Sequence, residues 1–193
     1  MKHLKGNIIA AIDVETTGTT PGYHEIIQIA VVPLGPDLKP LKTAFYTNVR
    51  PEHLDRADPQ ALAINRLTPE TLEDAKDQAK VADLLVEFIQ GLKLPVGGKI
   101  IPLVHNWPFE LGFLTAWLGR PLFNDLFHYH PRDAMSYALA INDRAALHGK
   151  TPPFKSVGLA QLCEFFKITN GKPHDALYDC LAEIEVYRAL LQL

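Results

Sequence analysis

Short apolar runs separated by turn residues open the chain and predict strands. Residues 8–12 are all apolar and predict a first strand over residues 8–14, and mostly apolar segments predict a second strand over residues 25–32 and a third over residues 43–49. Runs of this length, bounded by turn residues, are typical of strands. The connections are short, and residues 18–22 form a turn, so we expect the three strands to pair in antiparallel fashion.

Beyond the third run, the apolar residues recur with the period of a helix. A short helix is predicted at residues 59–65, and a stronger one at residues 80–92. Residues 99–104 then form a short buried strand, in which Pro102 indicates an irregular start. The next helix begins at Pro108 and extends to about residue 118.

The last third of the chain predicts one more strand and three helices. The strand spans residues 126–132, and Asp133 and Ser156 are the expected N-caps of the two helices that follow. The final helix spans residues 175–192, and its inward-facing residues are Leu177, Cys180, Leu181, Ile184 and Leu191. Strands first, and then strands alternating with helices, predict an α/β fold with a mixed sheet covered by helices.

The composition is that of an ordinary globular protein with a single domain over residues 1–193. A net charge of −3 argues against a basic protein that coats nucleic acid, but not against a nuclease that grips a few nucleotides. Cys163 and Cys180 lie far apart, which fits reduced thiols in the cytoplasm better than a disulfide framework. The sequence shows neither a signal peptide nor a membrane-spanning run, so we expect a cytoplasmic protein with no membrane partner.

Asp13 and Glu15 carry the first sign of chemistry. They stand two residues apart at the end of the first predicted strand, so their side chains point to the same side of it. Burial and mutual repulsion would raise the pKa values of such a pair. A divalent cation resolves the conflict, because hard oxygen ligands suit Mg²⁺ or Mn²⁺. The alternative is a strand that simply ends in two solvated acids.

A second motif near the end of the chain favours the metal site. Residues 13–18 read Asp-Val-Glu-Thr-Thr-Gly, and residues 174–179 read His-Asp-Ala-Leu-Tyr-Asp. In this order and spacing, the two motifs resemble the DEDDh branch of the DnaQ-like 3′–5′ exonucleases across nearly the whole chain. The resemblance implies an RNase H-like sheet of five strands, three antiparallel and the others parallel, with helices on both faces.

The resemblance also implies a role for each motif residue. Asp13 would be shared by two metal ions, Mg²⁺ or Mn²⁺, Glu15 would hold the metal on the nucleophile side, and Asp179 would be a further ligand. His174, expected on a loop, would act as general base toward the attacking water, for which a pKa near neutrality is suited. Asp175 is interpreted as the N-cap of the last helix. The other histidines are assigned to solvent by default: His3, His24, His53, His105, His128, His130 and His148.

The middle motif departs from the family pattern. Residues 105–110 read His-Asn-Trp-Pro-Phe-Glu, and Glu110 stands where relatives usually carry an aspartate that supports the leaving-group metal. Charge is kept, but the carboxylate lies one methylene further from the backbone, so metal preference or activity could change. Taken alone, Glu110 is explained as a first-turn acid that complements the helix dipole.

Six residues are candidates for contact with the substrate, through the resemblance: Thr16, Thr17, Gly18, Asn65, Arg66 and Trp107. The first three would meet the terminal nucleotide, and the next two occupy the place where relatives contact the substrate backbone. Trp107 would stack on a base. The alternatives are a turn glycine at Gly18, an exposed arginine at Arg66 and a tryptophan packed against the sheet.

The leading hypothesis is a metal-dependent exonuclease that hydrolyses single-stranded DNA or RNA from the 3′ end to nucleoside 5′-monophosphates, by a two-metal mechanism with a histidine base. Direction and product come from the resemblance. A second hypothesis is a catalytically impaired nucleic-acid-binding or polymerase-associated module, which only Glu110 supports. A metal-free structural domain leaves the matching polar residues unexplained. The sugar preference, a polymerase partner and a homodimer stay open, although the short end after the last helix favours standalone action.

Overall fold

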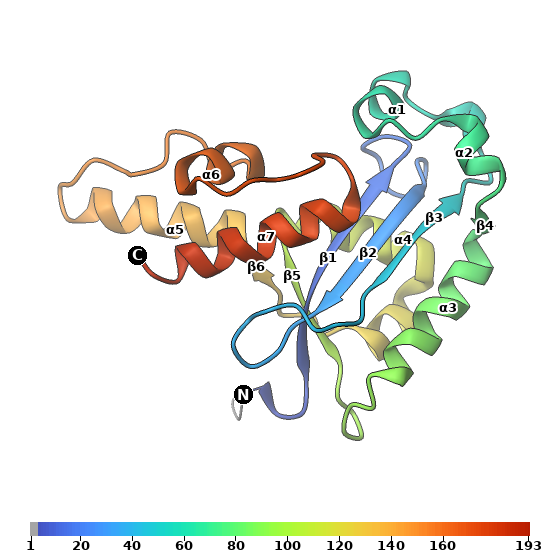
Figure 1. Ribbon diagram of the computed structural model, residues 1–193, viewed down its shortest axis with the longest axis horizontal. Helices are drawn as coiled ribbons and strands as arrows, with labels where there is room; N and C mark the ends of the chain where they lie inside the picture. The colour runs from blue at the N-terminus through green and yellow to red at the C-terminus, as the bar shows by residue number, and fades with distance from the viewer. Residues whose placement is uncertain (1–3) are drawn as a thin grey trace.

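A mixed sheet of six strands forms the centre of the computed structural model, which describes residues 4–193 (Figure 1). The order across the sheet is β4-β3-β2-β1-β5-β6. The strands are β1 Ile8–Thr16, β2 Ile26–Pro33, β3 Phe45–Arg50, β4 Lys76–Asp77, β5 Ile100–Val104 and β6 Arg132–Asp133. β1, β2 and β3 pair in antiparallel fashion, as predicted, whereas β5 runs parallel to both β1 and β6.

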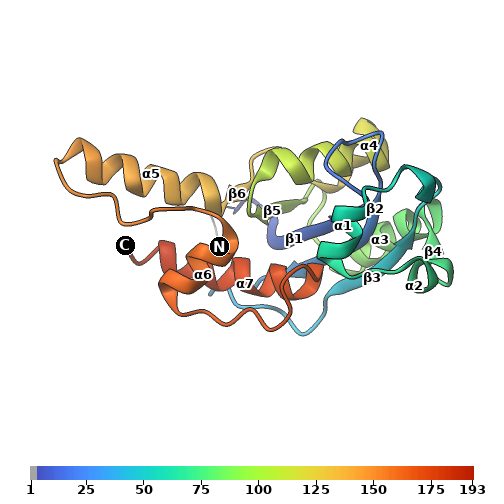
Figure 2. The same ribbon diagram turned by 90° about the horizontal axis from the view of Figure 1, so that it is seen from above.

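Helices connect the strands and cover both faces of the sheet. They are the 3₁₀ helix η2 Leu54–Arg56, α1 Pro59–Asn65, α2 Pro69–Glu73, α3 Gln78–Gly91, α4 Trp107–Leu126, α5 Ala134–Leu147, α6 Leu159–Phe166 and α7 Ala176–Leu190. Seen from above, α4 lies on one side of the strands and α7 on the other (Figure 2). α7 contacts β1 and β2, and in Figure 1 α5 and α6 extend away from the sheet.

Alternation along β1 divides its side chains between two hydrophobic cores. Ile9 and Ala11 pack with residues of α5, α6 and α7. Ala10, Ile12 and Val14 pack with residues of α3 and α4. Because successive side chains of a strand point to opposite faces, residues 13 and 15 continue the α7 face. The alternation along β1 therefore places both carboxylates on the face of the sheet that α7 covers.

The sheet differs from the prediction at both edges. It has six strands rather than five because β4, only two residues long, adds to the outer side of β3. The strand predicted over residues 126–132 is wrong for most of its length, since α4 continues to Leu126 and β6 contains only Arg132–Asp133. Gly119, at a φ of 71°, kinks α4 instead of ending it, so the chain reaches the sheet later than predicted.

Pro102 lies in the middle of β5 and does not make its start irregular, contrary to the prediction. The carbonyl of Ile100 accepts a hydrogen bond from His128 N at 2.7 Å, on the side of β5 away from β1. Successive residues of a parallel strand bond to alternate sides, so the proline nitrogen also faces away from β1. The ladder with β6 begins only at Leu103, which is why the missing N–H costs no pairing.

Two details of the C-terminal helices are also corrected. Gly158, not Ser156, is the N-cap of α6, and Val157 beside it packs against the core. On α7, Cys180 and Ile184 are buried as predicted, but Leu181 and Leu191 are 38% and 42% exposed. α7 contacts the sheet on one side and α5 and α6 on others, so its buried arc is wide and includes polar positions.

Candidate active site

The end of β1 brings its two carboxylates to the α7 face. Asp13 lies opposite Ala30 of β2, and Glu15 lies opposite Gln28. The register then shifts between Glu15 and Thr16, a bulge that re-aims the chain where the strand ends. The two acids are therefore held on a strand, and the bulge directly after them changes the direction of its last residue, Thr16.

The start of α7 is fastened to β2 and β3. Asp175 is the N-cap and accepts a hydrogen bond from Leu177 N at 3.2 Å, as the sequence predicted. Its other carboxylate oxygen accepts from Tyr46 Oη at 2.8 Å and from Lys172 Nζ at 2.7 Å. Gln28 Oε1 accepts from Ala176 N at 2.9 Å. Burial raises the pKa of Asp175, but the Lys172 and Tyr46 hydrogen bonds outweigh it and hold that pKa below its ordinary value.

Asp179, in the first turn of α7, lies beside Glu15 of β1 and His174 of the loop before the helix. One potential ligand atom from each lies within 4.8 Å of the others. The main-chain N–H of His174 donates to Asp179 Oδ2 at 3.0 Å, and Asn170 Nδ2 donates to Asp179 Oδ1. His174 is exposed and takes a left-handed φ of 63°, which is unusual for a residue with a Cβ. The 170–174 loop thus carries an imidazole next to two carboxylates without burying it.

Burial and mutual repulsion raise the pKa values of these acids. The pKa of Asp13 lies well above its ordinary value because of burial first, and then because of the charges of Glu15, Glu110 and Asp179. Burial and the charge of Asp179 raise the pKa of Glu15 from 4.5 to about 7. Burial raises the pKa of Glu110 to about 8. These raised pKa values indicate a site where several carboxyl groups lie so close together that ionising all of them is unfavourable.

Two of these carboxylates have an oxygen that is buried and unsatisfied. Within residues 4–193, neither Asp13 Oδ2 nor Glu110 Oε2 has a hydrogen-bond partner. Buried polar atoms normally have one, and a carboxylate oxygen can only accept. Bound divalent cations would offset the repulsion among these acids, and ligand atoms of Glu15, His174 and Asp179 lie within 4.8 Å of one another, so the residues present fit Mg²⁺ or Mn²⁺.

Glu110 is set in place by the end of β5 and by Asp133. It lies in the first turn of α4 and is 3% exposed. Asp133 Oδ1 and Oδ2 accept from Asn106 N at 3.1 Å and Trp107 N at 3.4 Å, immediately before and at the start of α4. Asp133 also accepts from Met135 N at 3.1 Å and so caps α5, as predicted. One aspartate thus orients both helices that leave the β5 and β6 ends.

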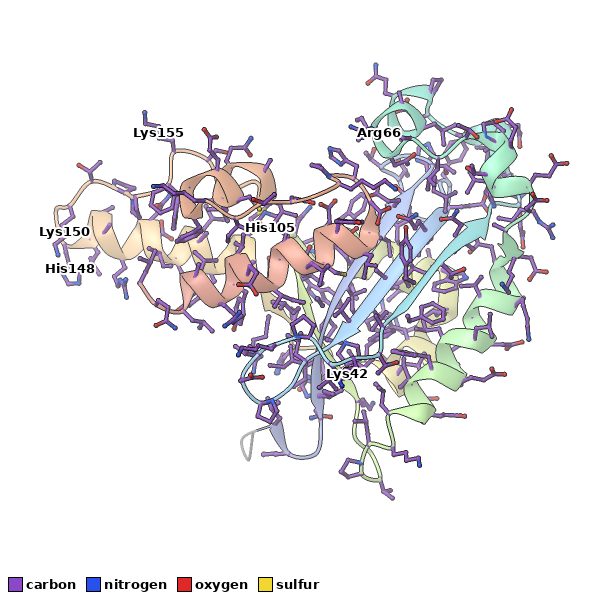
Figure 3. All side chains as sticks on the ribbon, viewed as in Figure 1. Lys42, Arg66, His105, His148, Lys150 and Lys155 are labelled. Atoms are coloured by element: carbon purple, nitrogen blue, oxygen red, sulfur yellow. The ribbon has the colours of Figure 1, made fainter. Side chains whose placement is uncertain are left out.

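His105 corrects the assignment of the spare histidines to solvent. It follows β5 directly, and both ring nitrogens are buried without a hydrogen-bond partner within residues 4–193. Burial lowers its pKa below the ordinary value. His148, by contrast, is exposed at the end of α5, as Figure 3 shows, and His3 lies outside the described residues.

Glu183 was missed by the sequence prediction. It stands one turn after Asp179 on α7 and is 1% exposed. Burial, followed by the charges of Asp13, Glu110 and Asp179, raises its pKa well above the ordinary value. Residues four apart share a face of a helix, so the spacing from Asp179 was the signal that could have found it.

The residues proposed for substrate contact mostly build the loop after β1. Thr16 Oγ1 donates to the carbonyl of Gly18 at 2.6 Å, and Thr17 Oγ1 accepts from Glu25 N at 2.9 Å. Asn65 is buried, and its Nδ2 donates to the Thr16 carbonyl at 3.2 Å, which fastens α1 to this loop. A Cβ on Gly18 would lie 2.5 Å from the His24 ring, so close packing rather than turn geometry requires glycine.

The two larger candidates lie at the margins of the site. Arg66 follows α1 in a left-handed conformation and is exposed, and Figure 3 shows it on the α1 side of the molecule. Trp107 is half-buried, with its ring centroid 6.2 Å from that of Phe123. Packing against the core beside Phe123 therefore accounts for the buried part of the indole.

Across residues 4–193, none of the helices combines the length and the apolar character that crossing a bilayer requires.

Comparison with known proteins gives matches over most of the chain. The model of a family described as "Exonuclease" matches residues 10–187. DNA polymerase III subunit epsilon of Escherichia coli (strain K12) is 28% identical over 186 residues, which cover 93% of this chain and 69% of that protein. Ribonuclease T of Baumannia cicadellinicola subsp. Homalodisca coagulata is 28% identical over 195 residues, covering 97% and 84% of the two chains.

Solved structures with the same fold include nucleases bound to nucleic acid components. E. coli Exonuclease I in complex with a dT13 oligonucleotide superimposes with a TM-score of 0.68 at 19% identity, over 96% of this chain but only 40% of that one. The nuclease domain of 3′hExo, a DEDDh family member bound to rAMP, gives a TM-score of 0.69 at 18% identity, over 96% and 92%. At these identities the structures establish the shared fold.

Proposed function

The chain belongs to the exonuclease family, which confirms the predicted family, enzyme class and fold, and we propose that it is a metal-dependent 3′–5′ exonuclease acting on single-stranded nucleic acid. The observation that carries the proposal is the convergence of Glu15, Asp179 and His174, with ligand atoms within 4.8 Å of one another. Asp13 and Glu110 add buried carboxylate oxygens that have no hydrogen-bond partner within residues 4–193. Together these groups form an acidic site with one basic side chain at its rim.

The acidic residues would hold two divalent cations, Mg²⁺ or Mn²⁺. Asp13 is central, since Glu15, Glu110 and Asp179 all raise its pKa by their charge. When bound, such cations supply the Lewis-acid chemistry, namely activation of water and neutralisation of charge on the phosphodiester. Glu15 and Asp179 would hold one side of the site, and Glu110 would approach from α4 on the other.

His174 would act as the general base. It is exposed, it lies beside Glu15 and Asp179, and its main chain is fixed by Asp179 Oδ2 at 3.0 Å. A positioned base of this kind contributes roughly 10²–10⁴-fold to a rate.

The substrate would be a single strand with a free 3′ end, released as nucleoside 5′-monophosphates. The names of relatives include both DNA polymerase III subunit epsilon and Ribonuclease T, so DNA and RNA are both candidates. The loop of Thr16, Thr17 and Gly18 adjoins the carboxylates and would meet the terminal nucleotide through its main chain, because its hydroxyls are engaged internally. Arg66 would contact phosphate, and the exposed face of Trp107 would stack on a base.

A nuclease assay tests this proposal. Single-stranded DNA and RNA oligonucleotides labelled at the 5′ end are incubated with Mg²⁺, Mn²⁺ or EDTA, using the full chain, His174→Ala, Asp13→Asn and a control, His148→Ala. We expect a metal-dependent ladder that shortens from the 3′ end, loses at least about 100-fold in rate in His174→Ala, and is unchanged in the control.

The same assay distinguishes the second hypothesis. If the full chain binds the oligonucleotides but cleaves neither under either metal, the proposal is wrong, and an impaired binding module with Glu110 as its mark is favoured. The unsatisfied Glu110 Oε2 argues for a retained site instead, because a glutamate freed from metal binding would have no reason to remain buried and unpaired.

A further inference from the structure

A group of aromatic and basic side chains lies outside the acidic site, where the chain returns from α4 to the edge of the sheet. Residues 128–130 read His-Tyr-His and lie between the end of α4 and β6. The main-chain N–H of His128 donates to the carbonyl of Ile100 at 2.7 Å, which fixes this segment against the start of β5. The proposed mechanism uses none of these three residues and does not account for their arrangement.

The three side chains of the segment form a compact group of rings. The rings of His128 and Tyr129 are stacked, with centroids 5.0 Å apart and planes at 10° to one another. The centroid of the His130 ring lies 4.0 Å from that of Tyr129 and 5.4 Å from that of His128. Tyr129 is nevertheless 69% exposed, so its neighbours position the ring without covering it. An aromatic ring that is positioned and exposed offers a surface on which a nucleobase can stack.

The pocket beside these rings is basic. It has a volume of about 230 Å³, and the described residues that line it include both histidines, Lys5 and Arg132, but no acid. None of these four residues forms an ion pair within residues 4–193. Arg132 Nη1 donates to the carbonyl of Pro131 at 3.3 Å, a contact that leaves most of the guanidinium donors for a ligand. Since the whole chain has a net charge of −3, its average composition does not explain this local excess of basic residues.

Hydrogen bonding and charge leave His128 able to donate to an anion. Its Nδ1 atom accepts from the main-chain N–H of His130 at 3.1 Å. In the neutral ring the proton is therefore on Nε2, which is a donor. Burial, followed by the positive charges of His130, Lys99 and Arg132, lowers the pKa of this histidine below its ordinary value. A bound phosphate would offset the repulsion among these positive charges.

Arg132 connects the basic pocket to the edge of the acidic site. It also lines a groove of about 510 Å³, together with Trp107 and Tyr137. Asp133 lines the same groove, but its carboxylate already accepts hydrogen bonds from main-chain N–H groups at the start of α4. Trp107 begins α4, three residues before Glu110 of the acidic site. A strand whose 3′ end lies at the carboxylates can therefore continue past Trp107, along the groove and into the basic pocket.

We propose that residues 128–132, with Lys5 beside them, bind the nucleotides that precede the 3′ end of a single strand. Tyr129 stacks on a base, and the basic residues bind backbone phosphates. The inference rests on the proposed exonuclease function, to which it adds a substrate-binding surface. Positive charge along the backbone, combined with aromatic stacking, binds single strands with little preference for sequence, so the surface would serve DNA and RNA alike.

A solvated edge of the sheet is the competing explanation. β6 is an edge strand, and charged residues at such an edge prevent it from pairing with another chain. Two exposed residues separate the explanations. Tyr129→Ala removes the ring, and Tyr129→Phe, which keeps it, is the matched control. Lys5→Ala removes a charge, and its matched control is Lys155→Ala, at an exposed lysine of the loop between α5 and α6 (Figure 3).

The experiment is fluorescence anisotropy with labelled single-stranded oligonucleotides of three and twelve nucleotides, in EDTA so that no metal-dependent cleavage occurs. We expect the full chain to bind the longer oligonucleotide more tightly, and Tyr129→Ala to bind it about 5–100-fold more weakly than the full chain does. Tyr129→Phe should bind it as the full chain does. Lys5→Ala should reduce the slope of log affinity against log salt concentration by about 0.7, the value for one phosphate contact on a single strand, while Lys155→Ala leaves the slope unchanged.

Several results would overturn the inference. They are equal affinity of the full chain for both lengths, no binding of either length, unchanged affinity in Tyr129→Ala, equal losses in Tyr129→Ala and Tyr129→Phe, and equal slopes in Lys5→Ala and Lys155→Ala. The nuclease assay is independent of these measurements. A full chain that cleaves, while Tyr129→Ala binds normally, keeps the exonuclease function and loses this surface. A full chain that binds through Tyr129 and Lys5 but does not cleave loses only the exonuclease function.

Discussion

Neutralising Glu15 should stabilise the metal-free protein while it damages the site. The side chain is held on β1 beside Asp179, and burial together with that charge raises the pKa of Glu15 from 4.5 to about 7. An acid whose pKa is higher in the folded protein binds more protons there than in the unfolded chain. Stability therefore falls as pH rises from about 4.5 through about 7, and Glu15→Gln should remove this contribution.

The size of the effect follows from the shift. Each tenfold change in proton affinity corresponds to about 1.4 kcal/mol, so ionised Glu15 costs the folded protein up to ~3 kcal/mol once the pH is well above 7. The side chain is partly exposed, and neighbouring acids can take up protons when one is removed, so about 1–3 kcal/mol is the expected gain at pH 8. At pH 5, where Glu15 stays protonated in the folded protein and only the unfolded chain has begun to ionise, the gain should be less than about 1 kcal/mol.

Urea unfolding in EDTA measures this directly, at pH 5, 6, 7 and 8, for the full chain, Glu15→Gln and an exposed control, Glu164→Gln. The midpoint difference between Glu15→Gln and the full chain should grow with pH, whereas the control should show none. Adding Mn²⁺ should reverse the order by stabilising the full chain more. A difference independent of pH, or a destabilised Glu15→Gln at pH 8, would show that repulsion in the empty site does not limit stability.

Three further changes test individual contacts. His174→Ala should lower the cleavage rate about 10²–10⁴-fold while weakening Mn²⁺ affinity only modestly. The part of the pH–rate profile that reports the general base should also be lost. A normal cleavage rate would exclude this histidine as the base. Gly18→Ala should destabilise the protein by roughly 1–3 kcal/mol because its Cβ would meet the His24 ring at 2.5 Å, and an unchanged melting temperature would contradict that packing. Asp175→Ala should lower the free energy of unfolding by about 1–2 kcal/mol, because it removes the cap of α7 and the partner of Lys172. A lower midpoint in urea measures this loss. If the free energy of Mn²⁺ binding falls by more than the free energy of unfolding, Asp175 is a metal ligand instead.

Local features of this protein follow from its sequence without knowledge of the packing. The alternation along residues 8–15 is enough to place Asp13 and Glu15 on one face of β1, because side chains of a strand alternate whatever the strand packs against. Asp133 and Asp175 were predictable as N-caps, since a cap satisfies N–H groups of its own helix. The two distant motifs also indicate the family, because their residue types and order can be read along the chain without knowing how it folds.

Which elements cover which depends on tertiary packing. The periodicity of α7 suggested that Leu181 and Leu191 face inward, yet α7 is buried on several sides, so both leucines are partly exposed and Glu183 is buried. Likewise, His105 could be known as buried only once α7 and the segment near Val157 lay over the end of β5. A repeat pattern fixes which residues of one element share a face, but the burial of that face depends on partners distant in the chain, and those long-range contacts are what folding adds.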